Sequence, residues 1–199
     1  MKKTIIFDLG GVLVEDGVYP MQRNLSEKFN LDYGEVKRFS VAGFRRMFVG
    51  KLSENEFWKK FDYKFGLNNG TAELSKELHE YYKINNGVKN LIARLKKNGY
   101  KVGFLSNSTK EITGYLEKKY GFTDMFDFGV FSHKVRTRKP HKKIFGIALK
   151  RANSDAKSTI FIDDNLSYIK GAKAAGLTTI HFISAPQTID SLKKLGVDV

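Results

Sequence analysis

Short apolar runs rich in β-branched residues recur along the chain, and they limit the folds that it can adopt. Most of these runs lie between longer segments whose apolar residues have helical spacing. Short strands that are apolar on both faces are typical of a parallel sheet covered by helices. The pattern therefore predicts an α/β fold. The runs are Thr4–Phe7, Val102–Leu105, Thr159–Ile162 and Thr179–Ile183, with a weaker one at Phe128–Phe131.

The segment formed by residues 15–84 lacks such runs and instead carries aromatic and aliphatic residues at helical spacing. Ser53, with Glu56 three residues later, has the pattern of a capping box at the start of a helix. We interpret the aromatic stripe as packing rather than as a ligand site, because apolar residues at regular spacing usually face a core. We therefore expect a core domain made of residues 1–14 and 85–199, with a small all-helical cap (residues 15–84) inserted after the first strand.

The composition is that of a globular protein with one sizeable core. The chain has 199 residues, 41% of them hydrophobic, and only 3 Pro. It has no Cys, which excludes disulfides, thiolate metal sites and cysteine nucleophiles. The apolar stretch near the start carries Asp8 in its middle, unlike a signal peptide, and no segment approaches the roughly 20 apolar residues of a membrane span. We expect a soluble, cytoplasmic protein with no membrane partner.

The net charge of +14 suggests an anionic ligand or partner. Between residues 15 and 83 there are 12 basic and 11 acidic residues, whereas the rest of the chain has 23 and 10. The segment from His133 to Lys143 holds six Lys or Arg and no acidic residue. Nucleic acid is one candidate partner, but it is not favoured because no aromatic residues interleave with the basic ones. A small phosphorylated substrate explains the charge equally well.

Polar side chains follow two of the apolar runs. Asp8 comes directly after the first run and precedes Gly10 and Gly11, while Ser106 and Asn107 follow the second. In an open parallel sheet, ligands bind beyond the carboxyl ends of the strands. Asp8 is thus a candidate nucleophile or metal ligand, with a turn-capping role as the alternative. Ser106 and Asn107 are candidates to bind an anionic oxygen, and ordinary turn residues are the alternative.

Two further groups carry charge that suits a phosphate site. Lys139 precedes Pro140, which fixes the local backbone and suits the first turn of a helix. This lysine could neutralise both a phosphate and a carboxylate, although on charge alone it reads as one more solvated lysine. Asp163 and Asp164 end the fourth run, and their mutual repulsion would be relieved by a hard cation such as Mg²⁺. A pair of helix-capping acids is the alternative.

Taken in order, Asp8 with its Gly turn, the LSNST string, the RKP string and the IDDN string make the chain resemble the haloacid dehalogenase superfamily. The resemblance spans nearly the whole chain and implies a Rossmann-like sheet, a helical cap and a reaction through an aspartyl-phosphate. It implies that Asp8 is the nucleophile, Lys139 the charge neutraliser, and Ser106, Asn107, Gly10 and Gly11 the substrate-binding groups. It also implies Mg²⁺ as the cofactor, held by Asp8, Asp163, Asp164 and the carbonyl of Gly10.

The sequence departs from the family pattern at Gly10, where phosphatases of the superfamily usually have a second Asp that acts as general acid and base. Such help is typically worth about 10²- to 10⁴-fold in rate. The favoured interpretation is a working phosphatase in which Glu15, Asp16, a cap group or water assists. Sugar 1-phosphate hydrolases are among the relatives with D-L-G, so a sugar phosphate is one candidate substrate.

Two other interpretations of the chain remain open. One is a protein that binds phosphorylated ligands or nucleic acid without turnover. The other is a metal-independent 2-haloacid dehalogenase, which the intact Asp163 and Asp164 pair disfavours. The sequence does not predict an oligomeric state.

Substrate choice is expected to reside in the cap. Arg45, Arg46 and Tyr19 are the candidates to contact the organic part of a substrate. Because adjacent residues cannot share one face of a helix, at most one of the two arginines should point at the site.

Overall fold

The computed structural model describes residues 2–67 and 74–199. Within these ranges, five strands form one sheet in the order β3-β2-β1-β4-β5, and every neighbouring pair is parallel. All residues of the central strand β1 are buried, which explains why three of its four residues, Ile5, Ile6 and Phe7, are apolar. The predicted α/β fold is confirmed. The strands are β1 (Thr4–Phe7), β2 (Lys101–Ser106), β3 (Phe128–Phe131), β4 (Thr159–Asp163) and β5 (Thr178–His181).

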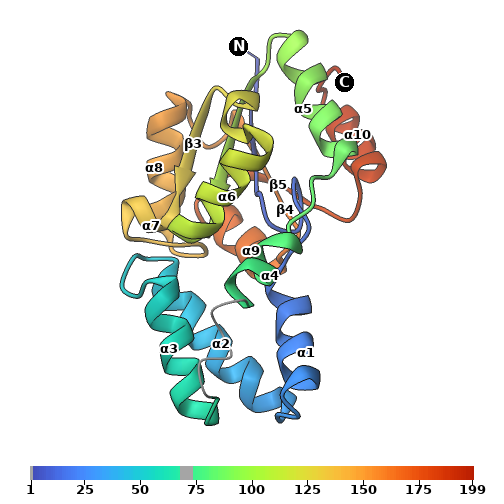
Figure 1. Ribbon diagram of the computed structural model, residues 1–199. Helices are drawn as coiled ribbons and strands as arrows, with labels where there is room; N and C mark the ends of the chain where they lie inside the picture. The colour runs from blue at the N-terminus through green and yellow to red at the C-terminus, as the bar shows by residue number, and fades with distance from the viewer. Residues whose placement is uncertain (1, 68–73) are drawn as a thin grey trace.

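Helices cover both faces of this sheet (Figure 1). On one face, α8 and α9 pack on a cluster that includes Ile6 and Phe161, and α5 and α10 pack together on the other face. The helices in chain order are α1 (Val18–Lys28), α2 (Tyr33–Met47), α3 (Glu54–Phe65), α4 (Leu74–Glu80), α5 (Asn86–Lys97), α6 (Lys110–Tyr120), the short 3₁₀ helix η1 (Phe122–Met125), α7 (Ser132–Val135), α8 (Lys142–Ala152), α9 (Leu166–Ala174) and α10 (Ala185–Lys194).

The strand ends differ from the predicted ones by one or two residues. β2 extends to Ser106 and β4 to Asp163, so both of these polar residues belong to strands. β5 ends at His181 rather than at Ile183, because His181 is paired with the last residue of β4 and no neighbouring strand continues beyond it. The polar side chains thus emerge directly from the carboxyl end of the sheet.

The helices between β1 and β2 include a separate group, and we call α1–α4 the helical insertion. Figure 1 shows α1, α2 and α3 grouped beyond the carboxyl ends of the strands. α2 and α3 start at side-chain caps, and Ser53 with Glu56 forms the expected capping box at the start of α3. Residues 68–73, which belong to the predicted cap, lie outside the described residues.

The aromatic residues of the insertion pack against one another. Phe57 and Phe61 are at most 1% exposed, and both rings contact Phe39 and Trp58 with centroids 4.9–6.0 Å apart. Such contacts stabilise a core beyond the area they bury. The interpretation of the aromatic stripe as core packing is confirmed.

The chain passes between the sheet and the insertion at two adjacent points. The N–H of Glu15 donates to the carbonyl of Lys83 at 2.9 Å, and the N–H of Asn85 donates to the carbonyl of Leu13 at 2.7 Å. An isolated bridge joins Val14 to Ile84 between them. The outgoing and returning segments are therefore tied together where the insertion begins and ends.

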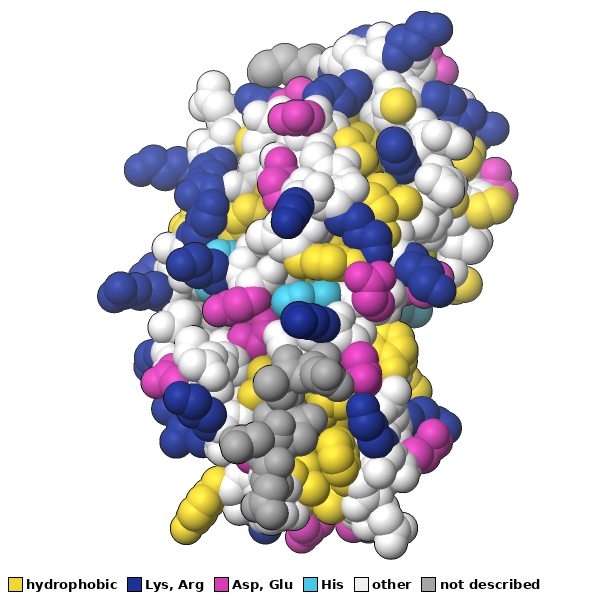
Figure 2. All heavy atoms as spheres, viewed as in Figure 1, with side chains coloured by type: hydrophobic (Ala, Val, Ile, Leu, Met, Phe, Trp, Pro, Cys, Tyr) yellow, Lys and Arg dark blue, Asp and Glu magenta, His cyan; other side chains and the backbone are white. Residues whose placement is uncertain are grey.

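Figure 2 shows the charge distribution on one face of the molecule. Basic side chains are frequent over the upper part, which holds the sheet, while basic and acidic side chains alternate over the insertion below. The difference follows the uneven charge along the sequence. None of the helices in residues 2–67 and 74–199 is both long enough and apolar enough to span a membrane.

Candidate active site

A cleft of about 620 Å³ lies at the carboxyl end of the sheet. The sheet side of the cleft contributes Asp8, Ser106 and Asp164, and α2 of the insertion contributes Arg45. Lys139 and Asp163 lie next to this cleft and are fully buried. The edge of a parallel sheet where strands end is the usual place for a ligand in such folds.

Asp8 follows β1 and is only 6% exposed. Its Oδ1 accepts a hydrogen bond from the N–H of Leu9 at 2.7 Å and lies 2.8 Å from Nζ of Lys139. Both contacts hold the same oxygen, so the carboxylate is fixed in orientation. In the part of the chain that the structure describes, Oδ2 has no hydrogen-bond donor, and this oxygen is left for chemistry.

The ammonium of Lys139 lies between two carboxylates. Its Nζ is 2.8 Å from Oδ1 of Asp8 and 2.6 Å from Oδ2 of Asp163. The rings of Phe161 and Tyr168 are 5.4 and 4.8 Å from this nitrogen, which adds cation–π contact. Lys139 is therefore not a solvated lysine, and the expectation from charge alone was wrong because it ignored the tertiary position of the residue.

Three carboxylates converge at this point. Asp8, Asp163 and Asp164 each offer an oxygen atom, and these oxygen atoms all lie within 4.8 Å of one another. Asp163 is fully buried, and its Oδ1 accepts the N–H of Asn165 at 2.8 Å. Oxygen ligands at such spacing are what a hard divalent cation requires.

The electrostatics of the cluster are unbalanced because one ammonium faces three carboxylates. Burial raises the pKa of Asp8, and the nearby Asp163 raises it further against the opposing effect of Lys139. Burial and the neighbouring Asp163 also raise the pKa of Asp164, from 3.8 to about 6. Burial alone would lower the pKa of Lys139, but Asp163 and Asp8 together raise it, so the lysine stays protonated.

The two glycines after Asp8 have different surroundings. Gly11 has φ of +79°, and a Cβ there would lie 2.4 Å from a carboxylate oxygen of Asp164. Position 11 therefore requires glycine for both its backbone and its space. At Gly10, by contrast, no atom of the described residues, apart from its two chain neighbours, lies within 4 Å of the place that a Cβ would occupy, and the residue lines the cleft.

Ser106 and Asn107 both line the cleft, but their side chains are engaged differently. The Ser106 hydroxyl has no hydrogen-bond partner among the described residues, which leaves it able to donate to a bound anion. The Asn107 amide is occupied at both ends, since its Oδ1 accepts from the N–H of Lys139 at 2.9 Å and its Nδ2 donates to the carbonyl of Lys139 at 3.1 Å. This side chain therefore positions the lysine, a role that the sequence pattern did not predict.

The loop before α8 differs from the expectation. Pro140 does not form the first turn of a helix, because α8 begins at Lys142 with His141 as its N-cap. Pro140 instead contacts α9, where a Cβ at Gly171 would lie 2.7 Å from its ring, and it lines the cleft beside Arg138. The proline thus holds the end of the lysine loop against the helix that follows Asp164.

Of the three residues in the insertion that were expected to contact the substrate, only one lines the cleft, because the three point in different directions from their helices. Arg45 lines the cleft, whereas Arg46 does not and lies near Glu56 at the start of α3. Tyr19 is also outside the cleft, with its hydroxyl accepting from Arg23 at 2.9 Å. The directions of these side chains depend on the rotation of α1 and α2 relative to the sheet, and the spacing of residues in the sequence does not determine that rotation.

Asp16 lines the cleft as well, and Glu15 does not. Oδ1 of Asp16 accepts the N–H of Val18 at 2.9 Å, which fixes the side chain at the start of α1. Asp16 is exposed, and partial desolvation by its protein surroundings raises its pKa above the usual value. Asp16 is thus a second kind of carboxylate in the cleft, separate from the three that cluster around Lys139.

The basic segment from His133 to Lys143 does not act as one surface. Lys139 is buried, and Arg138 donates to the carbonyl of Lys139 at 3.2 Å while lining the cleft. The ring of His133 contacts the carbonyl of Ser108 through Nδ1 at 3.0 Å. Part of this positive charge therefore belongs to the cleft rather than to an open surface.

Comparison with known proteins agrees with this geometry. The family of haloacid dehalogenase-like hydrolases matches residues 2–176. A glyceraldehyde 3-phosphate phosphatase from Pyrococcus furiosus is 35% identical over 194 residues, covering 90% of this chain and 80% of that protein. The sesquiterpene phosphatase astK from Aspergillus oryzae is 24% identical over 97% of this chain and 96% of that protein.

The fold is also similar to that of solved structures. The haloacid dehalogenase family enzyme bt-2542 from Bacteroides thetaiotaomicron, solved in complex with magnesium and inorganic phosphate, has a TM-score of 0.71 to this chain. The two sequences are 22% identical, and the match covers 90% of this chain and 93% of that one. At this level of identity the likeness concerns the fold.

Proposed function

The chain belongs to the haloacid dehalogenase-like hydrolase family, and on that premise we propose that it is a Mg²⁺-dependent phosphomonoesterase acting on a small phosphorylated substrate. One observation carries the proposal: three carboxylates and one buried ammonium meet at the floor of a single cleft. Two relatives that are named phosphatases share the phosphate group in their substrates and differ in the organic part. The common chemistry is thus the cleavage of a phosphate ester.

The donor set at the cleft fits a magnesium ion. Asp8, Asp163 and Asp164 bring three carboxylates together against the single charge of Lys139, which leaves an excess of negative charge that a divalent cation offsets. Together with the carbonyl of Gly10, these residues would hold Mg²⁺. A bound Mg²⁺ supplies positive charge to the phosphate oxygens during transfer.

In the first step, Oδ2 of Asp8 attacks the phosphorus atom and the bond between phosphorus and the ester oxygen breaks. Lys139 holds Oδ1 of the same carboxylate, which keeps the attacking oxygen aligned. The hydroxyl of Ser106 donates to a phosphate oxygen, where negative charge must be stabilised. The products of this step are an aspartyl-phosphate and the alcohol, which needs a proton.

We infer that Asp16 supplies this proton. It lines the cleft, and its Oδ1 is fixed by the N–H of Val18. In the second step, the Asp16 carboxylate takes a proton from water as the water oxygen attacks phosphorus. The bond from phosphorus to Asp8 breaks, and inorganic phosphate and the free Asp8 carboxylate are produced.

The helical insertion has the position of a cap in this scheme. It contributes Asp16 and Arg45 to the cleft and is joined to the sheet by two adjacent segments. We propose that residues 15–84 form the cap and residues 1–14 and 85–199 the catalytic core. A cap that closes over the cleft would limit water during the first step and admit it for the second.

The test is phosphate release from a panel of phosphorylated compounds, measured with Mg²⁺ and with EDTA. The proposal requires release that depends on the metal. Tight binding of the same compounds without release would instead support a phospho-ligand binding protein. Chloride release from 2-haloacids in the presence of EDTA would support a dehalogenase.

A further inference from the structure

The lining of the cleft is of two chemical kinds. One part holds the carboxylates, Ser106 and the groups near Lys139, as described above. The other part consists of aliphatic and aromatic side chains from both the insertion and the sheet region, and residues 15–84 also contribute the charged Asp16 and Arg45. A ligand that contacts both parts must itself have a charged part and an apolar part.

The wall on the side of the insertion is apolar along two helices. Val18 begins α1, Val41 and Phe44 lie on α2, and Phe48 is the C-cap of α2; these last three have the three- and four-residue spacing of one helix face. Val41 is 36% exposed. Val41 is thus an apolar side chain left open to the cleft.

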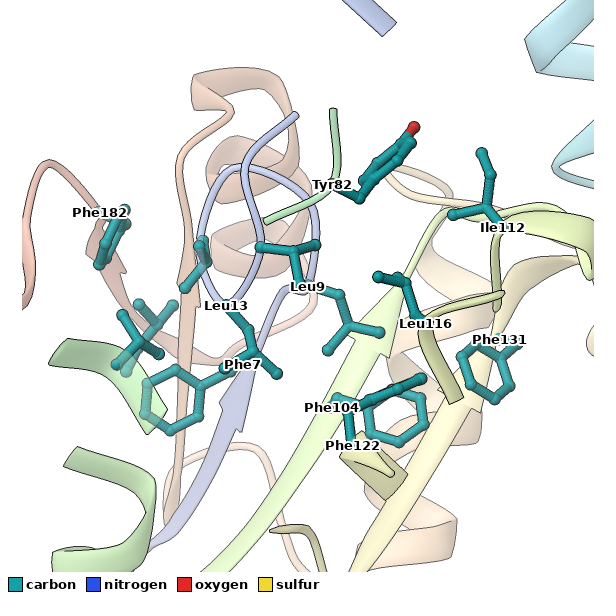
Figure 3. Close-up of a cluster of buried hydrophobic side chains, with 14 of the residues drawn as sticks. Phe7, Leu9, Leu13, Tyr82, Phe104, Ile112, Leu116, Phe122, Phe131 and Phe182 are labelled. Atoms are coloured by element: carbon teal, nitrogen blue, oxygen red, sulfur yellow. The ribbon is translucent and has the colours of Figure 1, made fainter. Parts of the chain in front are cut away.

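The facing wall comes from the loop after β1 and from α6. Figure 3 shows Leu9, Ile112 and Leu116, with Tyr82, above the rings of Phe104, Phe122 and Phe131. Leu9, Ile112 and Leu116 are at most 3% exposed and belong to the main core, so this wall is rigid. The apolar part of the lining therefore includes members of the main hydrophobic core.

From these two walls we propose that the organic part of the substrate is apolar, an alkyl, prenyl or aryl alcohol, rather than a sugar. The proposal rests on the phosphomonoesterase function proposed above and adds the chemical class of the leaving group. A sugar would present hydroxyl groups to Val18, Val41, Phe44, Phe48, Ile112 and Leu116, whose side chains cannot hydrogen-bond. Buried hydroxyls without partners weaken binding, whereas methylene groups gain from leaving water.

The size of the cleft agrees with such a substrate. Its volume of about 620 Å³ can be compared with the roughly 30 Å³ that one water molecule occupies in the liquid. An inorganic phosphate fills only a small part of it. The remaining volume is available to the organic part of a substrate.

Arg45, like Asp16 and Arg138, is a charged residue in the lining of the cleft, and its position on α2 beside the apolar wall bears on this assignment. It lines the cleft from α2, and its side chain is exposed. The aliphatic stem of an arginine can cover apolar surface while its guanidinium remains in water. If Arg45 instead bound a second anionic group, substrates with a carboxylate, such as 2-phosphoglycolate, would be preferred to alkyl phosphates.

The decisive experiment is a chain-length series. Ethyl, butyl, hexyl and octyl phosphate have nearly the same ester chemistry, so differences in kcat/KM report contacts with the alkyl chain. We expect kcat/KM to rise by about threefold to fourfold per methylene until the apolar walls are filled. Glycerol 3-phosphate, glucose 1-phosphate and 2-phosphoglycolate complete the panel and should be poorer substrates than hexyl phosphate.

Variants locate the effect in the cleft. Val41→Asn should flatten the dependence of kcat/KM on chain length, because it places a polar group in the apolar wall. Ile183→Asn is the matched control, because Ile183 is 72% exposed and does not line the cleft. This control should keep the full dependence.

Calorimetric binding of ethyl- and octylphosphonate, which are not hydrolysed, separates this proposal from the proposed function. Tighter binding of octylphosphonate without hydrolysis of any ester would support the apolar subsite and contradict the phosphatase reaction. Hydrolysis with equal or better rates on glucose 1-phosphate or 2-phosphoglycolate would overturn the apolar subsite and leave the phosphatase reaction standing.

Discussion

Glu54 in the helical insertion and Asp8 in the sheet region are both buried carboxylates, but their surroundings differ. Glu54 accepts hydrogen bonds from Trp58 and Ser75 and contacts a ring nitrogen of His79. Asp8 instead shares one ammonium with Asp163, while Asp164 crowds the same place.

The pKa directions follow this difference. Burial tends to raise the pKa of Glu54, but His79 and Ser75 outweigh it and the net shift is downward. The pKa of Asp8 is raised by burial and by Asp163. A buried carboxylate whose oxygens have hydrogen-bond partners stabilises the fold. A cluster of carboxylates with excess negative charge is instead suited to bind a cation and a substrate.

Replacing each of these carboxylates by its amide should have opposite consequences. Asp8→Asn removes the nucleophile, and we expect kcat to fall by about 10⁴-fold or more. The same change relieves repulsion, so Tm of the metal-free protein should rise. Glu54→Gln should leave kcat within about threefold but lower stability by about 1–3 kcal/mol, because it disturbs a satisfied buried network.

Steady-state kinetics and thermal unfolding of the two variants test this comparison. If Glu54→Gln lost activity as completely as Asp8→Asn, the distinction between a structural and a chemical carboxylate would fail.

Removing the ammonium of Lys139, which Asp8 and Asp163 share, should lower both the stability of the fold and kcat. Lys139→Met leaves Asp8 and Asp163 without their neutralising partner, and we expect the metal-free protein to lose about 3–5 kcal/mol of stability. We also expect kcat to fall by about 10²- to 10³-fold. Denaturant unfolding with and without Mg²⁺ measures the first effect, and Mg²⁺ should restore part of the loss. A variant as stable as the parent without metal would contradict this account of the cluster.

A carboxylate introduced at position 10 should restore activity to a variant that lacks the Asp16 carboxylate. Asp16→Asn should lower kcat by about 10²-fold on esters with poor leaving groups and less on p-nitrophenyl phosphate, which needs no proton donor. Because the space at Gly10 is open, Gly10→Asp should fit and restore much of this activity.

Gly11→Ala is the contrasting control, since its Cβ would meet Asp164 and its positive φ disfavours alanine by about 1–2 kcal/mol. Equal losses on all esters in Asp16→Asn would place the proton donor elsewhere.

The smallest expected effect is a pair of opposite pH dependences in the metal-free protein. The pKa of Asp164 is about 6 in the fold and 3.8 without it, so its contribution to stability falls as pH rises from 3.8 to 6. The pKa of Glu54 is lowered from 4.5, so its contribution is complete above 4.5 and is lost as pH falls below it. Asp164→Asn should flatten the first slope and Glu54→Gln the second. Unfolding free energies measured across this range would refute the assignment if both variants changed the same slope.

Much of the sheet and part of the site could be predicted from the sequence. The strands follow from short apolar runs, and Asp8, Ser106 and Asp163 follow because the carboxyl ends of parallel strands meet at one edge. The start of α3 could be predicted from Ser53 and Glu56, because a capping box is a local sequence pattern.

The rest depends on contacts between residues far apart in the chain. Asn107 bonds the backbone of Lys139, which lies 32 residues away, and nothing local to either residue signals this pairing. Likewise, Ser75 and His79 reach Glu54 from another helix. The choice between Arg45 and Arg46 required the rotation of α2 relative to the sheet, which periodicity leaves undetermined.

The central claim is that Asp8 carries the phosphoryl group between the two half-reactions. Its most direct test is to mix the protein with Mg²⁺ and a hydrolysed phosphate ester, quench with acid during turnover, and locate the added phosphoryl mass by peptide mass spectrometry. The account predicts modification of the peptide that contains Asp8, and none in Asp8→Asn. A phosphoryl group on another residue, or rapid turnover with no modified peptide, would contradict it.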